Sequence, residues 1–430
     1  MDGIWQKIPG MQRPELRAWA LYDWGNSAFA TIMMTAVLPI YFADVAAADL
    51  PANMRTATWG YTTSAALVFI SILGPVLGNI ADSSGRRLRM LALFTGLGVV
   101  ASGLMAMVGQ GDWLLASLLF VAGNIGFAGG EIFYEALLPH ICSRDEVNRV
   151  STTGFALGYL GGGVLLAISL VLIQMPETFG LADAGVAVRL SFIAVALWWG
   201  FFSVPLFRRI REPARPDHPH AAGIIPAFRQ LWKTLKEITR YRDAFLFLVA
   251  FWAYSDGIGT IIKMATVYGK EVGIGTSDMI GAILFVQFFG IPCAFFFGWL
   301  GDKWGEKKGL YLTLVVYTLI TVLAWFMTTG WQFWILAGGI GFVQGGAQAL
   351  SRSIYSRLIP AKRSAEFFGF YSASSRFAGI IGPLAFGLMG QFGGGGRNAV
   401  IMVAFLFIAG MLLLAGVDTE RGYARAAAGD

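Results

Sequence analysis

The sequence predicts an all-α membrane protein with about twelve transmembrane helices in two pseudo-symmetric six-helix bundles. Three observations indicate this class: 56% of the residues are hydrophobic and 13% are charged, apolar runs of transmembrane length recur along the chain, and one charged turn occurs twice. A soluble domain carries roughly twice this charged fraction. Because about 20 apolar residues in a helix cross roughly 30 Å of hydrocarbon, each long run is expected to span the bilayer.

Each half of the chain contains six predicted spans. In the first domain, 1–207, they are 17–44, 56–82, 88–109, 113–138, 149–174 and 186–207. In the second domain, 243–430, they are 243–271, 277–300, 307–328, 331–357, 364–390 and 396–417. The segment 208–242 is predicted to be a cytoplasmic linker. Its residues 224–239 have apolar side chains at helical spacing beside basic ones, which fits both an amphipathic helix on anionic lipid and a solvated linker helix.

The basic residues give the predicted orientation. Arg13, Arg17 and the arginines of 86–89 fall on the same side as the linker, and the positive-inside rule makes that side cytoplasmic. Both termini are therefore expected in the cytoplasm, in the plasma (inner) membrane if the source is prokaryotic. The formal charge of +6 is attributed to this loop bias, so no nucleic-acid partner is expected. The expected partners are the lipid bilayer and a small-molecule solute. The protein is expected to function as a monomer.

A charged turn, Gly78–Met90, separates the second and third predicted spans, and a weaker copy occupies 298–308. Asp82 and Asp302 are separated by 220 residues (302 − 82 = 220), as are Gly85 and Gly305 (305 − 85 = 220). A single copy would fit any arginine-rich cytoplasmic loop, whereas two copies at matching positions indicate related halves. Glycine permits close helix approach and tight turns, and aspartate can pair with arginine. The predicted conformational-switch residues are Gly78, Asp82, Gly85, Arg86, Arg87, Asp302, Gly305 and Lys307.

The pattern Gly-x-x-x-Asp-x-x-Gly-Arg-Arg in this turn resembles the signature loop of the major facilitator superfamily of transporters. The resemblance implies duplicated six-helix halves that bind a solute between them near the membrane midplane and work by alternating access. The run from Gly154 to Gly163 is similar to a glycine-rich motif of antiporters of this superfamily, but Tyr159 stands where they have proline. We therefore interpret its glycines as small residues for close helix packing.

Ionisable residues inside the predicted spans are candidates for solute or proton binding, because they are costly in hydrocarbon unless they face a cavity or a partner. In the first span, Tyr22, Asp23 and Asn26 suit a small polar solute, or equally an interfacial anchor with a capping aspartate. Glu131 and Glu135 share a helix face at i and i+4, and two repelling carboxylates suit proton binding. Arg352 lies at the pseudo-symmetric depth and either neutralises one of them or forms an ion pair that holds one conformation.

The second half contributes Asp256 and Lys263 in the span 243–271 and Arg376 in the span 364–390. A buried arginine can hold a substrate carboxylate or phosphate in a bidentate manner, or it can simply pair with Asp256. The sequence leaves both possibilities open.

Three further motifs resemble one branch of the superfamily, the vacuole-effluxer family linked to autophagy, and its prokaryotic relatives. They are Tyr22–Ala28, Gln348–Ser353 and Ala365–Tyr371. The resemblance implies a secondary active transporter that exports amino acids or similar small polar solutes, with proton coupling as a hypothesis. The alternatives are multidrug efflux and a membrane sensor that binds solute without transporting it. An enzyme is not expected, because the chain has three peripheral histidines and no phosphate-binding Gly-x-x-x-x-Gly-Lys loop; no metal or cofactor is implied.

Overall fold

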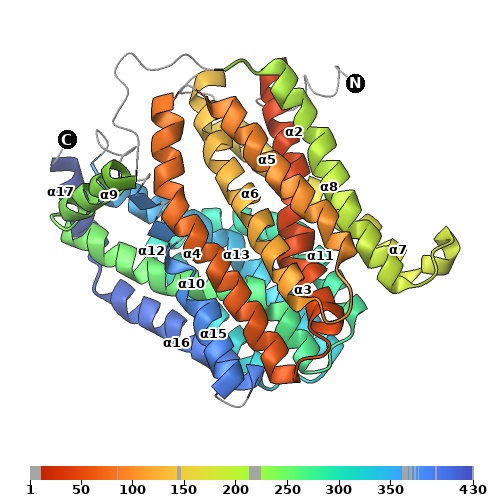
Figure 1. Cartoon of the computed structure of the whole chain (residues 1–430). Helices are drawn as coiled ribbons and strands as arrows, with labels where there is room; N and C mark the ends of the chain where they lie inside the picture. Colours follow the sequence, from red (N-terminus) through yellow and green to blue (C-terminus); the bar gives the residue numbers. More distant parts are fainter. Residues whose placement is uncertain are drawn as a thin grey trace. The chain divides into compact units, whose positions relative to one another are not determined.

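The computed structural model describes residues 11–84, 86–142, 147–212, 224–360, 367, 370–371, 374–375, 377–392 and 395–428. These residues form helices and no strands (Figure 1), so the predicted all-α class is confirmed. Within these ranges, eleven helices are long and apolar enough to cross a membrane. The predicted span 364–390 lies partly outside the described residues, and its described end forms the shorter apolar helix α15 (Ile381–Phe392).

The contacts group the chain into two compact units, one of 1–49 with 72–227 and the other of 50–71 with 228–430. Helix α4 (Ala52–Ser84) contributes its first part to the second unit and its end to the first. The predicted domains 1–207, 208–242 and 243–430 stay a prediction.

The first unit begins with a helix that changes its winding. The α-helix α2 (Pro14–Ala28) continues into the π-helix η1 (Phe29–Ala36), the short α3 (Leu38–Tyr41) and a second π-turn, η2 (Phe42–Ala46). Pro39 has no N–H to offer the helix, and just before it the Val37 N–H bonds to the Ile32 carbonyl, five residues back. The other elements are α5 (Arg87–Leu104), η3 (Met105–Met107), α6 (Trp113–Ile141), α7 (Val147–Gln174), η4 (Pro176–Phe179) and α8 (Ala184–Arg209).

The glycines of α7 allow this helix to pack closely on α2. A Cβ on Gly161 would stand 2.3 Å from the backbone oxygen of Trp24, and a Cβ on Gly154 would stand 2.5 Å from the Trp19 ring. Neither position therefore has room for a larger side chain, and the interpretation of these glycines as close-packing residues is confirmed.

Besides the first part of α4, the described residues of the second unit form most of α9 and seven further helices. They are α9 (Ile224–Ile238), α10 (Arg242–Glu271), α11 (Thr276–Trp304), α12 (Glu306–Trp325), α13 (Gly330–Leu358), α15, α16 (Gly396–Ala415) and α17 (Thr419–Ala428). The helix expected at 224–239 is thus present as α9, whereas its contact with lipid stays a prediction. Gly305, with φ +93°, forms the turn between α11 and α12, a conformation that favours glycine.

Candidate functional site

In the first unit, a buried aromatic stack joins α2 to α6. The Tyr134 ring of α6 stacks on Trp19 at 4.4 Å between ring centroids and on Tyr22 at 4.8 Å. Trp19 Nε1 donates to the Tyr134 backbone oxygen at 3.3 Å, and the Tyr134 hydroxyl donates to the Trp19 backbone oxygen at 3.1 Å. Because the stack and the two hydrogen bonds act together, α2 is held in one register against α6.

Tyr22 links this stack to Glu131 of α6. It is fully buried, and its hydroxyl lies 3.0 Å from Thr95 Oγ1 on α5. A Cβ on Gly130 would come within 3.0 Å of the same hydroxyl, so the absence of a side chain there makes room for Tyr22. The neighbouring Glu131 interacts electrostatically with Tyr22.

Asp23, the next residue of α2, lies beside α7 and interacts with the same group. Its Oδ1 accepts a hydrogen bond from Ser27 Oγ at 3.4 Å, and its carboxyl group lies against Gly158 of α7. Asp23 also interacts electrostatically with Glu135 and Tyr134. Four predicted residues therefore share one region of this unit: Tyr22, Asp23, Glu131 and Glu135. We call these four residues, together with Tyr134, the acidic-aromatic cluster.

The remaining prediction in α2, Asn26, is buried one turn beyond Asp23, and its Oδ1 has no hydrogen-bond partner. Sequence reasoning missed three residues that position the cluster: Trp19, Thr95 and Tyr134. Tyr134 was detectable, because it lies between the two glutamates on the same helix. Nothing in the sequence pointed to Thr95, whose role depends on a contact between α2 and α5.

The second unit repeats part of this arrangement on α10. The buried Tyr254 hydroxyl lies 2.7 Å from Ser351 Oγ on α13, much as Tyr22 meets Thr95. Tyr371 stacks on Phe251 at 4.3 Å and on Tyr355 at 4.8 Å. A buried tyrosine bonded to a hydroxyl of a neighbouring helix, beside stacked aromatic rings, is therefore found in both units.

Two predicted residues of α10, Asp256 and Lys263, interact electrostatically. Asp256 is 2% exposed and interacts electrostatically with Lys263, two turns further along the helix. The Lys263 backbone oxygen accepts a hydrogen bond from Trp59 Nε1 at 3.0 Å. Arg352 is exposed on α13, and its pairing with Glu131 or Glu135 stays a prediction. Arg376 lies outside the described residues.

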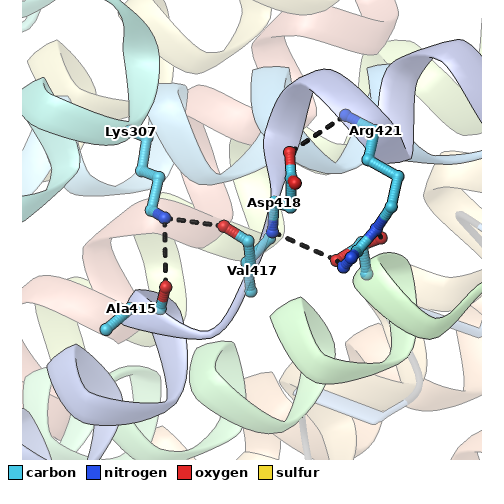
Figure 2. Close-up of polar contacts among 6 residues, drawn as sticks. Lys307, Ala415, Val417, Asp418 and Arg421 are labelled. Carbon is cyan, nitrogen blue, oxygen red and sulfur yellow. Dashed lines mark hydrogen bonds and ion pairs between the residues drawn. The ribbon is translucent and has the colours of Figure 1, made fainter.

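A lysine in the first turn of α12 bonds to the end of α16. Lys307 Nζ donates to the backbone oxygens of Val417 at 2.6 Å and Ala415 at 3.4 Å (Figure 2). These carbonyls lie at and beyond the last turn of α16, where helical partners are lacking and a cation is favourable. Lys307 thus caps this helix end, and its predicted role as a switch residue stays a prediction.

Helix α17 is attached to the same region by charged contacts. Arg421 donates to both carboxylate oxygens of Asp243, at the start of α10, and the Asp418 N–H donates to Asp243 Oδ1 at 3.1 Å (Figure 2). Glu306 accepts hydrogen bonds from Ser353 Oγ at 2.5 Å and from the Tyr423 hydroxyl at 2.8 Å. Burial and the adjacent Glu306 raise the pKa of Tyr423, so this hydroxyl remains a donor at neutral pH.

The first copy of the charged turn is only partly described. Gly78 and Asp82 lie in α4 and Asp302 lies in α11, but their side chains are outside the described part, as is the whole of Gly85. Arg86 is exposed. Arg87 is 5% exposed, and its Nε and Nη1 have no hydrogen-bond partner. The pairing of Asp82 with these arginines therefore stays a prediction.

Among the residues that the structure describes, no group of three or more His, Cys, Asp or Glu side chains could hold a metal ion.

Comparison with known proteins gives both sequence and structural relatives. Residues 50–427 match the family model described as vacuole effluxer Atg22 like. A Bacillus subtilis protein described as the uncharacterized MFS-type transporter YxiO is 37% identical over 407 residues, covering 94% of each chain. Autophagy-related protein 22 of Yarrowia lipolytica is 28% identical over 338 residues, which cover 71% of this chain and 56% of the relative.

Two solved structures have a similar fold. The nucleoside transporter NupG aligns with a TM-score of 0.67 at 12% identity, covering 94% of this chain and all of its own. A bacterial homologue of the human lysosomal transporter Spinster, in an inward-facing conformation, aligns with a TM-score of 0.65 at 14% identity, covering 96% of this chain and 97% of its own. At these identities the similarity concerns the fold.

Proposed function

Because the chain belongs to the Atg22-like vacuole effluxer family of MFS-type transporters, we propose that it exports amino acids or similar small polar solutes by alternating access. It is an integral multi-pass membrane protein, and its relatives are transporters and not enzymes, as predicted. We further propose that both termini are cytoplasmic, as the basic residues indicate, and that the monomer is the functional unit.

The acidic-aromatic cluster is the observation that carries this proposal. Carboxylates inside a membrane-spanning helix are unfavourable unless a cavity or a partner compensates them, yet Asp23, Glu131 and Glu135 interact with the same aromatic group. A substrate ammonium group can bind these carboxylates through charge-assisted hydrogen bonds. The stack formed by Trp19, Tyr22 and Tyr134 fixes the position of Asp23 because it fixes α2 against α6.

Proton coupling is the second part of the proposal. Neighbouring carboxylates repel each other when both are ionised, so one proton shared among them stabilises the group. Entry of a substrate ammonium would favour ionisation and release that proton. Proton release on substrate binding is the behaviour that an exporter needs if it exchanges solute against protons.

A proteoliposome assay tests the proposal directly. Proteoliposomes that contain the purified protein and are loaded with unlabelled amino acids should accumulate labelled amino acids by counterflow. An imposed pH gradient should change the rate of this uptake. Asp23→Asn, Glu131→Gln and Glu135→Gln should each reduce gradient-driven transport by about tenfold or more, as expected for removal of a charge-assisted contact. The matched control is Glu177→Gln, the same chemical change at an exposed residue of η4.

The alternatives give different results in the same assay. Counterflow of hydrophobic drugs without amino acids would support multidrug efflux. Saturable amino-acid binding without counterflow would support a non-transporting sensor. Unchanged gradient-driven transport in all three amide variants would contradict proton coupling through the cluster while leaving amino-acid export intact.

A further inference from the structure

We infer that the second unit contains a separate binding site for a monovalent organic amine with an aromatic or apolar body. The site is a cavity of about 490 Å³ between helices α9, α10 and α16 and the residues that lead into α15. This volume lies within the range of about 300–1,000 Å³ that is usual for small-molecule sites. Its walls include Leu231, Trp252, Asp256, Phe370, Phe377 and Leu406. The inference does not rest on the proposed export of amino acids.

The charge of the ligand follows from Asp256. It is the one ionisable side chain among the described residues that line the cavity. It is 2% exposed, and its Oδ1 lies against Gly382 without accepting a hydrogen bond of normal geometry. A buried carboxylate oxygen that accepts no hydrogen bond is unfavourable, so a bound cation near Oδ1 would stabilise this side of the cavity.

A single positive charge fits better than two. Lys263 lies two turns along α10 and already interacts electrostatically with Asp256, but it is not part of the cavity wall. A second cationic centre on the ligand would be repelled by Lys263 and would find no further carboxylate among the described lining residues.

The rest of the ligand should be apolar. Trp252 Nε1 donates to Ser374 Oγ at 3.0 Å, and Ser374 Oγ donates to the Tyr371 backbone oxygen at 3.0 Å. These donors are therefore occupied by the protein itself. The remaining lining residues are aliphatic or aromatic, and aromatic faces attract organic cations. No cationic side chain among the described lining residues can receive a carboxylate, so an amine is favoured over the corresponding amino acid.

Three indole compounds separate these properties: tryptamine is a monocation at neutral pH, tryptophol is its neutral alcohol, and tryptophan is the zwitterion. Equilibrium binding of each labelled compound to the purified full chain in detergent should rank tryptamine first, by roughly tenfold over either of the others. Asp256→Asn should remove this preference, whereas Glu177→Gln should keep it. Ala378→Phe, which fills the cavity and leaves Asp256 intact, should abolish tryptamine binding, and it serves as the second variant if Asp256→Asn fails to fold.

Two results would overturn the inference. Equal affinity for tryptamine and tryptophol would indicate an apolar cavity that accepts neutral groups such as lipid chains. Unchanged tryptamine affinity in Asp256→Asn or Ala378→Phe would place the amine elsewhere. These experiments measure amine binding and not amino-acid transport. Amine binding can therefore be absent while amino-acid counterflow is observed, and amine binding can be present while counterflow is absent.

Discussion

Arg421 of α17 holds the carboxylate of Asp243 in a bidentate contact, with Nη2 2.6 Å from Oδ1 and Nε 2.9 Å from Oδ2. The Asp243 side chain is 3% exposed, whereas that of Arg421 is 49% exposed. The two residues lie 178 positions apart, so this contact fixes the end of the chain to the start of α10. A planar guanidinium that bonds both carboxylate oxygens sets orientation as well as distance.

Arg421→Gln should detach α17 and lower the apparent melting temperature by several degrees, because it leaves the buried Asp243 carboxylate without its charged partner. The measurement is thermal unfolding of the purified protein in detergent. Arg425→Gln is the matched control, since Arg425 lies in the same short helix and is exposed. Equal melting temperatures of the two variants would show that the contact adds nothing to stability.

Lys307→Gln should loosen the end of α16. The substitution removes the cation that bonds the Ala415 and Val417 carbonyls, a loss of about 1 kcal/mol for contacts of this kind. Hydrogen exchange of backbone amides in 415–421 should become faster, while exchange in α5 should not change. Lys308→Gln removes an adjacent exposed lysine and should leave exchange in 415–421 as it is; acceleration in both variants would argue for a general charge effect.

Features that depend on residues close together in the sequence were predictable, whereas contacts between residues far apart in the sequence were not. The membrane spans, and the position of Glu131 and Glu135 one turn apart on the same helix, follow from local composition and helical spacing. Helix α17 was not predicted, because Thr419–Ala428 is short and polar and its docking depends on Asp243. Likewise, the stacking of Tyr134 on Trp19 joins residues 115 positions apart, and no local pattern encodes that register.

The contact of α7 with α2 predicts that Gly161→Ala is destabilising. The new Cβ would stand 2.3 Å from the Trp24 backbone oxygen, so the two helices must separate, at a cost of about 1–3 kcal/mol for overpacking of this kind. Gly96→Ala makes the same chemical change on α5, where a Cβ would meet no atom within 4 Å. We expect a lower melting temperature and weaker counterflow for Gly161→Ala only; wild-type behaviour of this variant would contradict the tight α2–α7 contact.

The aromatic stack gives the last prediction. Tyr134→Phe keeps the rings stacked on Trp19 and Tyr22 but removes the hydrogen bond to the Trp19 backbone oxygen, so it should cost about 1 kcal/mol. Tyr134→Ala also removes the ring and should cost about 3–5 kcal/mol. If the stack positions Asp23 for transport, counterflow should fall slightly in the first variant and be lost in the second. The assay must be run below the melting temperature of Tyr134→Ala, so that lost counterflow reports on the site and not on unfolding. Retention of full counterflow by folded Tyr134→Ala would show that the stack stabilises the unit without serving the site.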